Sequence, residues 1–141
     1  MEQRVSIISL AAGDLERSTT FYESLGWHRS FAAAEGIAFF QIGGLAFSLY
    51  PRDSMARDIG VPADGSGFAG FALAHNTREK GSVDAVLQET QQAGGQIVRG
   101  AADQFWGGYA ECLADPDGHL WEVAWNPHFP ISENGSITLP D

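Results

Sequence analysis

The distribution of apolar residues predicts a strand and then a helix at the start of the chain. Residues 5–12 are apolar and rich in β-branched side chains, which is typical of a buried strand. Asp14 is a suitable N-cap, and the apolar side chains between residues 15 and 25 recur at helical spacing. Gly26 suits the position after the helix. We therefore expect a strand over 5–12 and a helix over 15–25.

Three further strands complete the predicted first half, over residues 27–33, 37–42 and 45–50. The last two read as a hairpin that turns at Gly43 and Gly44. Residues 52–67 are rich in glycine and proline, which predicts a linker with one helical turn near 54–58.

The same order of elements then repeats. The pattern predicts a strand over 68–74, a helix over 83–93 capped by Ser82, a strand over 96–99, and a hairpin of 109–114 and 119–125. The two hairpins correspond at a constant offset of 74 positions, which relates Gly44, Phe47 and Ser48 to Gly118, Trp121 and Glu122. The sequence thus predicts a duplicated β-α-β-β-β unit, with modules over 1–51 and 68–127 and an irregular tail over 128–141, all in one structural domain.

Several segments resemble the vicinal oxygen chelate superfamily, the fold of glyoxalase I, extradiol dioxygenases and bleomycin-resistance proteins. The segments that carry this resemblance are Gly13–Ser18 with Phe21-Tyr22, Ala93–Gly95 and Asp115–Glu122, and residues 105–109 are similar to a glyoxalase-like subgroup. The resemblance implies an α+β fold in which two βαβββ modules form a curved, barrel-like mixed sheet around one cavity, with the helices outside. Because this fold hosts many activities, the fold by itself does not assign a function.

Metal-dependent members of this superfamily place four His, Glu or Gln ligands on four strands. The resemblance puts these positions at Ile7, Ser48, a residue near Gly70, and Glu122. Only Glu122 is a competent ligand, and a divalent cation needs several converging N or O donors. The expected metal site is therefore degenerate, and we expect no metal or other cofactor.

Strand alternation predicts which side chains line the cavity. If Glu122 and Ser48 point inward, their strand neighbours at every second position do so too. The predicted ligand-binding residues are Phe39, Gln41, Ser48, Tyr50, Trp106, Tyr109 and Leu120. The same count, across an assumed four-residue turn at 115–118, places Glu111 beside Glu122 and turns Cys112 toward the helix.

Two carboxylates on one dry face cannot both ionise cheaply, so one of them should have a raised pKa. Glu111 and Glu122 are therefore the candidate catalytic acid–base pair, or an anchor for an amine. In the alternative interpretation, one of them reaches solvent or pairs with an arginine such as Arg99. Trp106, with Phe105 and Tyr109, forms either a wall over the ligand or ordinary packing.

Composition limits the partners. The formal net charge of −10 disfavours nucleic acid, and no apolar run is long enough to span a membrane. A single cysteine, Cys112, and the lack of a signal-peptide pattern favour a cytoplasmic protein.

Three classes of function remain. The first is a metal-independent protein that binds a small aromatic or planar molecule, a cationic one included. The second is a lyase, isomerase or dioxygenase-type enzyme that uses Glu122, with or without a divalent metal. A module that has lost activity is a third possibility. The resemblance also implies a homodimer, and the sequence does not identify the ligand.

Overall fold

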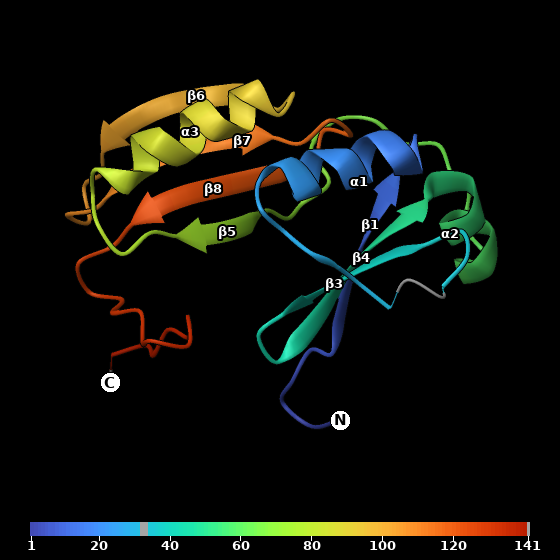
Figure 1. The fold of residues 1–141 in the computed structure, drawn as a ribbon, viewed down its shortest axis with the longest axis horizontal. Helices are drawn as coiled ribbons and strands as arrows, with labels where there is room; N and C mark the ends of the chain where they lie inside the picture. Colours follow the sequence, from blue (N-terminus) through green and yellow to red (C-terminus); the bar gives the residue numbers. More distant parts are fainter. Residues whose placement is uncertain (32–33, 141) are drawn as a thin grey trace. The chain divides into compact units, whose positions relative to one another are not determined.

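The computed structural model describes residues 1–31 and 34–140. The chain divides into two compact units, residues 1–69 and 70–141, and each is described by itself. Figure 1 shows the elements of both units along the chain. Within the described residues, no helix is long and apolar enough to cross a membrane.

The N-terminal unit is a four-stranded mixed sheet with a helix on one face. Its elements are β1 (Ile7–Ala12), α1 (Leu15–Ser24), β2 (Arg29–Ser30), β3 (Ala38–Ile42), β4 (Leu45–Pro51) and α2 (Arg52–Ile59). The strand order is β1-β4-β3-β2, in which β1 and β4 are parallel and the other pairs antiparallel. Asp14 caps α1 as predicted, because its Oδ1 accepts from the Arg17 N–H at 3.0 Å.

Aromatic side chains fill the space between α1 and this sheet. Tyr22 of α1 lies between Phe40 and Phe47, with its ring 5.0 Å from that of Phe47 in an edge-to-face arrangement. Trp27 packs on the same rings. Such pairs contribute beyond the area that they bury, so this face is a dense core.

The C-terminal unit repeats the arrangement. Its elements are β5 (Leu73–Asn76), α3 (Ser82–Gln92), β6 (Gln96–Asp103), β7 (Tyr109–Ala114) and β8 (Leu120–Trp125), and the strand order is β5-β8-β7-β6. Helix α3 covers one face, over β6, β7 and β8 (Figure 1). Its core centres on Val83, Leu113 and Val123, with Tyr109, Trp121 and Trp125 among the partly buried residues packed against them. The α+β class and the repeated order are thus confirmed, whereas closure into a barrel-like sheet stays a prediction.

Five predicted elements differ from the structure, and one is the strand expected over 96–99, which continues to Asp103 as β6. The strand expected over 27–33 is only β2, since Phe31 adopts a positive φ of 53°, and residues 32–33 lie outside the described part. The helical turn expected near 54–58 is the full helix α2, ended by left-handed Gly60. The strand expected over 68–74 begins only at Leu73, after Gly67 and Gly70, which both have positive φ.

The last difference concerns the start of α3. Ser82 is its first residue, Gly81 is the N-cap, and no side chain caps the helix. The serine therefore does not perform the capping role that the sequence suggested.

Candidate functional site

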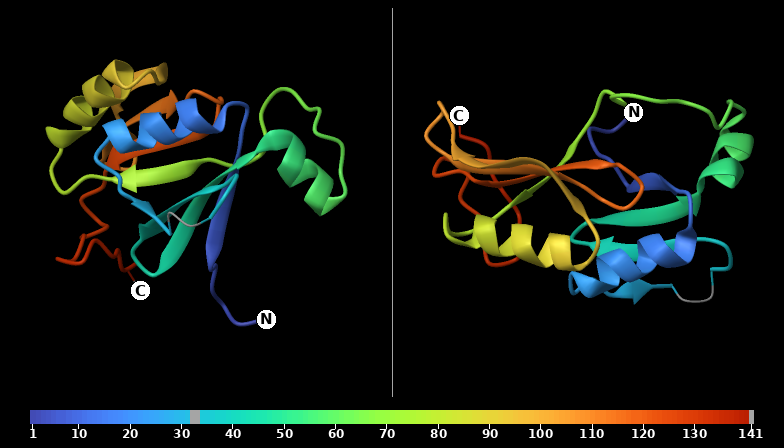
Figure 2. Two further views of the ribbon diagram at one scale, coloured as in Figure 1. Left: turned by 45° about the vertical axis from the view of Figure 1, so that its right-hand side comes forward. Right: turned by 90° about the horizontal axis from the view of Figure 1, so that it is seen from above.

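The C-terminal unit contains a cavity of about 1050 Å³ beside β5 and β8. The segment after β8 folds back along β5 and supplies the other wall (Figures 1 and 2). The strands contribute Ala74, His75, Asn76, Glu122 and Ala124. The tail contributes Asn126, His128, Phe129, Ile131, Gly135 and Ile137, and loops and α3 add Thr77, Arg78, Ser82, Val86 and Trp106. The volume suits a small organic molecule.

Glu122 supplies the only carboxylate among the described residues that line this cavity. It is half-buried on the face of the sheet opposite α3, where its strand neighbours are Ala74 of β5 and Cys112 of β7. No described residue forms a hydrogen bond or ion pair with its carboxylate. Glu122 is thus an acceptor that a bound molecule can reach.

The predicted pairing of Glu111 with Glu122 is wrong. Glu111 lies opposite Val123, and the position opposite Glu122 is Cys112. The β7–β8 loop has three residues, 116–118, rather than four, because the Asp115 N–H donates to the His119 carbonyl at 3.0 Å and Gly118 takes a φ of +86°. This shift of one residue moves every β7 side chain to the other face.

Glu111 therefore points into the core beneath α3. It is 0% exposed, and among the described residues neither carboxylate oxygen has a hydrogen-bond partner. Burial, and then the nearby negative charge of Asp84, raise the pKa of Glu111 from 4.5 to about 7. One carboxyl group does have a raised pKa, as expected. It is that of Glu111, and the main cause is burial rather than a pairing with Glu122.

Tyr109 and Cys112 change faces for the same reason. Tyr109 packs on the core of the C-terminal unit, donates its hydroxyl to Asp84 at 3.1 Å, and lies with its ring centroid 4.9 Å from the Lys80 ammonium. Desolvation and the Asp84 hydrogen bond raise the pKa of Tyr109. Neither Tyr109 nor Leu120 lines the cavity.

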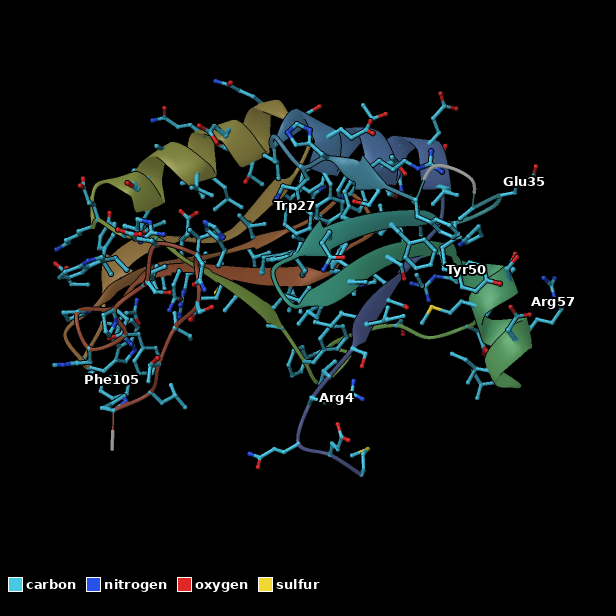
Figure 3. All side chains as sticks on the ribbon, turned by 60° about the horizontal axis from the view of Figure 1, so that its bottom comes forward. Arg4, Trp27, Glu35, Tyr50, Arg57 and Phe105 are labelled. Atoms are coloured by element: carbon cyan, nitrogen blue, oxygen red, sulfur yellow. The ribbon has the colours of Figure 1, made fainter. Side chains whose placement is uncertain are left out.

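Trp106 does line the cavity, and a glycine fixes its position. The indole packs directly on Gly108, where a Cβ atom would lie 1.6 Å from Cζ3 of the ring. Trp106 lies in the loop between β6 and β7, which is closed by the Gln104 N–H donating to the Gly108 carbonyl at 2.8 Å. Phe105 at its tip is 100% exposed and points outward (Figure 3), so Trp106 and Phe105 play different roles.

The predicted residues of the N-terminal unit share one face of their sheet, as expected. Phe39 lies opposite Ser48, and Gln41 lies opposite Ala46. Gln41 donates its amide to the carbonyls of Gly43 and Leu45, and Tyr50 donates to Asp58 on α2, toward which it points in Figure 3. The Asp58 hydrogen bond raises the pKa of Tyr50. These polar groups already have partners within their own unit.

The strand register shows which residues lie beside Ser48 and Glu122, two of the four family ligand positions. Ser9, not Ile7, lies beside Ser48, and the two hydroxyls are 2.8 Å apart. Ala74, not a residue near Gly70, lies beside Glu122. Taken within its own unit, neither a pair of serines that bond to each other nor an alanine beside one carboxylate forms the donor set that a divalent cation needs. Within the described residues, no three His, Cys, Asp or Glu side chains come together.

Sequence reasoning missed the tail as part of the site. His128, Phe129, Ile131 and Ile137 were assigned to an irregular segment, yet all line the cavity. The signal was present in Asn134-Gly135, a strong hairpin-turn dipeptide between two isoleucines. His75 lines the cavity as well, and desolvation around its ring lowers its pKa although the residue stays exposed.

Comparisons with known proteins agree with this architecture. The model of the glyoxalase/bleomycin resistance protein/dioxygenase superfamily matches residues 4–123, and the chain belongs to this family. Among its structural relatives is a glyoxalase-related enzyme from Fulvimarina pelagi, with 38% identity, 99% of both chains covered and a TM-score of 0.90. None of the curated proteins matches the chain.

More distant relatives share the fold alone. A hypothetical protein, SA1046 from S. aureus, is 21% identical over 89% of this chain and 95% of its own, with a TM-score of 0.78. A lactoylglutathione lyase from Agrobacterium tumefaciens is 20% identical over 89% of this chain and 96% of its own, with a TM-score of 0.66.

Proposed function

We propose that this protein binds a small aromatic or planar molecule, with a cationic group, in the cavity of the C-terminal unit and without a metal ion. One observation carries the proposal: the half-buried carboxylate of Glu122 faces the cavity and has no partner among the described residues. A charge-assisted hydrogen bond from an amine or amidine would satisfy it. Trp106 and Phe129 offer aromatic surface to a planar body.

The other cavity groups are consistent with a cationic ligand. His75 is neutral at pH 7, since desolvation lowers its pKa. Arg78 brings a positive charge, but its guanidinium donates to the carbonyls of Ile131 and Ser132. Glu122 therefore supplies the one negative charge among the described lining residues, and apart from Arg78 the other side chains are apolar, aromatic, amide, hydroxyl or imidazole groups.

Proflavine, a planar aromatic cation, tests this proposal by fluorescence titration in the presence of EDTA. We expect Glu122→Gln to weaken its binding about 10- to 100-fold, the value of a lost charge-assisted hydrogen bond. Glu89→Gln removes the same charge from an exposed site on α3 and should leave binding unchanged. Equal affinity of the wild type and Glu122→Gln, or binding only after addition of Zn²⁺ or Ni²⁺, would overturn the proposal.

A second candidate is catalysis by Glu122, favoured by the 38% identity to a glyoxalase-related enzyme. In this case the carboxylate would act as a base toward a substrate in the same cavity. Formation of lactoylglutathione from methylglyoxal and glutathione, measured with and without Zn²⁺ or Ni²⁺, separates the two. Turnover that Glu122→Gln abolishes would favour the enzyme over the binding protein.

A further inference from the structure

The end of the chain forms a small hairpin that is built independently of any ligand. Ile131 and Ile137 pair as an antiparallel bridge around a turn at Gly135, which has a φ of +86°. Ser132 closes the turn, since its N–H and its hydroxyl both donate to the Ser136 carbonyl at 2.9 Å. We call residues 131–137 the C-terminal hairpin. Its internal hydrogen bonds give it a defined shape.

Arg78 attaches this hairpin to the loop between β5 and α3. Its two terminal nitrogens donate to the carbonyls of Ile131 and Ser132, both at 2.8 Å. A guanidinium can hold two neighbouring carbonyls because its N–H groups form a rigid fork, whereas the ammonium of lysine is a single point of attachment. The hairpin is therefore fixed at the residue where it begins.

The attached hairpin brings apolar side chains to the cavity. Ile131 and Ile137 line it with their side chains and Gly135 with its backbone, together with Glu122 and Trp106. The family model ends at residue 123, before the hairpin begins. The match to the Fulvimarina pelagi protein covers 99% of this chain, whereas that to the S. aureus protein covers 89%. The hairpin thus lies outside the part of the chain that the family model matches.

From these observations we infer that the C-terminal hairpin determines the size of the molecule that the cavity accepts, and that Arg78 is the positioning residue that holds it. This inference rests on the proposed binding function. Glu122 fixes the charged group of the ligand, and Ile131 and Ile137 limit how far its apolar body extends. The ligand class is therefore an aromatic cation whose ring system is selected by length.

Two cations of different length test the inference: benzamidine, with one ring, and proflavine, with three fused rings. Ile137→Trp fills part of the wall, so we expect proflavine affinity to fall by about tenfold or more while benzamidine affinity changes less than about twofold. Ile137→Ala should act in the opposite direction. Leu139→Trp, at an exposed position just beyond the hairpin, is the control and should change neither affinity.

Arg78 is tested by the ratio of the two affinities and by hydrogen exchange. Arg78→Ala should reduce the discrimination between the two cations and speed exchange of the Ser132 and Ser136 amides. Arg78→Lys should restore little of either, because it cannot hold both carbonyls. Arg99→Ala, an exposed arginine in the same unit, should leave both readouts unchanged.

The outcomes separate the inference from the function on which it rests. If proflavine binds the wild type and Glu122→Gln weakens it, but Ile137→Trp and Arg78→Ala leave both affinities unchanged, the hairpin does not determine size. If neither cation binds the wild type, the proposed function fails and the inference fails with it. Far-ultraviolet circular dichroism of each variant identifies any loss of affinity that comes from unfolding.

Discussion

The two units build the same sheet and then use its helix-covered face in different ways. In the N-terminal unit Ala38 lies opposite Leu49, and in the C-terminal unit Glu111 lies opposite Val123 at the corresponding position. Both Ala38 and Glu111 are 0% exposed. The same place in a duplicated fold thus holds a methyl group in one copy and a carboxyl group in the other.

The packing around these positions explains how each is tolerated. Ala38 is small because large rings, those of Tyr22, Phe40 and Phe47, already fill the space beneath α1. The fully buried core beneath α3 centres on Val83, Leu113 and Val123, and larger rings, those of Tyr109, Trp121 and Trp125, pack against it from partly buried positions. The side chain of Glu111 is fully buried in this core. The difference teaches that the strand order does not depend on the chemical character of the core.

The opposite faces differ as well. Ser9 and Ser48 satisfy each other across β1 and β4, at an Oγ–Oγ distance of 2.8 Å. Their counterparts in the C-terminal unit are Ala74 and Glu122, and the alanine offers no hydrogen bond to the carboxylate. In the N-terminal unit the polar side chains on this face thus bond to each other, whereas in the C-terminal unit the Glu122 carboxylate faces the cavity as an acceptor.

The largest expected effect comes from replacing Ala38 of the N-terminal unit by glutamate, the residue that the C-terminal unit has at the corresponding position. Ala38→Glu would place a carboxylate among aromatic rings that leave it no room and no partner. We expect the free energy of unfolding to fall by about 4 kcal/mol or more, or the unit to unfold. Urea unfolding followed by tryptophan fluorescence measures the change.

An exposed alanine provides the control for this change. Ala69→Glu adds the same charge at an exposed site and should alter stability by less than about 0.5 kcal/mol. If Ala38→Glu is as stable as Ala69→Glu, the two helix-covered faces do not differ in the way described.

The next effect concerns Glu111 and pH. Its pKa of about 7 in the folded chain lies above its ordinary value of 4.5, so between these values the folded chain retains a proton that the unfolded chain has lost. The free energy of unfolding therefore falls as pH rises from 4.5 to 7 and stays reduced above that. The shift corresponds to about 3 kcal/mol.

Glu111→Gln removes this penalty while keeping the shape of the side chain. We expect the variant to be more stable than the wild type by about 3 kcal/mol at pH 8 and to match it near pH 4. Thermal unfolding at both pH values tests this, with Glu89→Gln as the exposed control. A variant that gains equally at pH 4 and pH 8 would show that ionisation of Glu111 is not the cause.

The sequence predicted the repeat well because the repeat depends on local signals. The Asp14 cap, the Gly43-Gly44 turn and the alternation in β3 and β4 each involve neighbouring residues, and each prediction is confirmed. The face of Glu111 depended instead on whether a loop has three or four residues. Asp115–Gly118 fits either length, and only the hydrogen bond between Asp115 and His119 decides it.

The site was harder to predict because its parts are distant in sequence. Arg78 acts through residues 131 and 132, more than fifty positions away, and nothing local to Arg78 indicates this. The cavity wall formed by the tail depends on that contact. Sequence patterns therefore located Glu122 and Trp106, which belong to the repeated strands and their loops, but not the hairpin that faces them.

The smallest expected effect comes from the serine pair of the N-terminal unit. Ser9→Ala removes one hydroxyl and leaves Ser48, which is 0% exposed, without this partner, so stability should fall by about 1 kcal/mol. Removing both hydroxyls should cost less than the sum of the single changes, because no unpaired group remains. A double-mutant cycle in urea measures this coupling. Since Ser9 and Ser48 do not line the cavity, proflavine affinity should be the same in all four proteins. A strictly additive cycle would show that the two hydroxyls do not satisfy each other, and the contrast with Ala74 and Glu122 would then lose its physical basis.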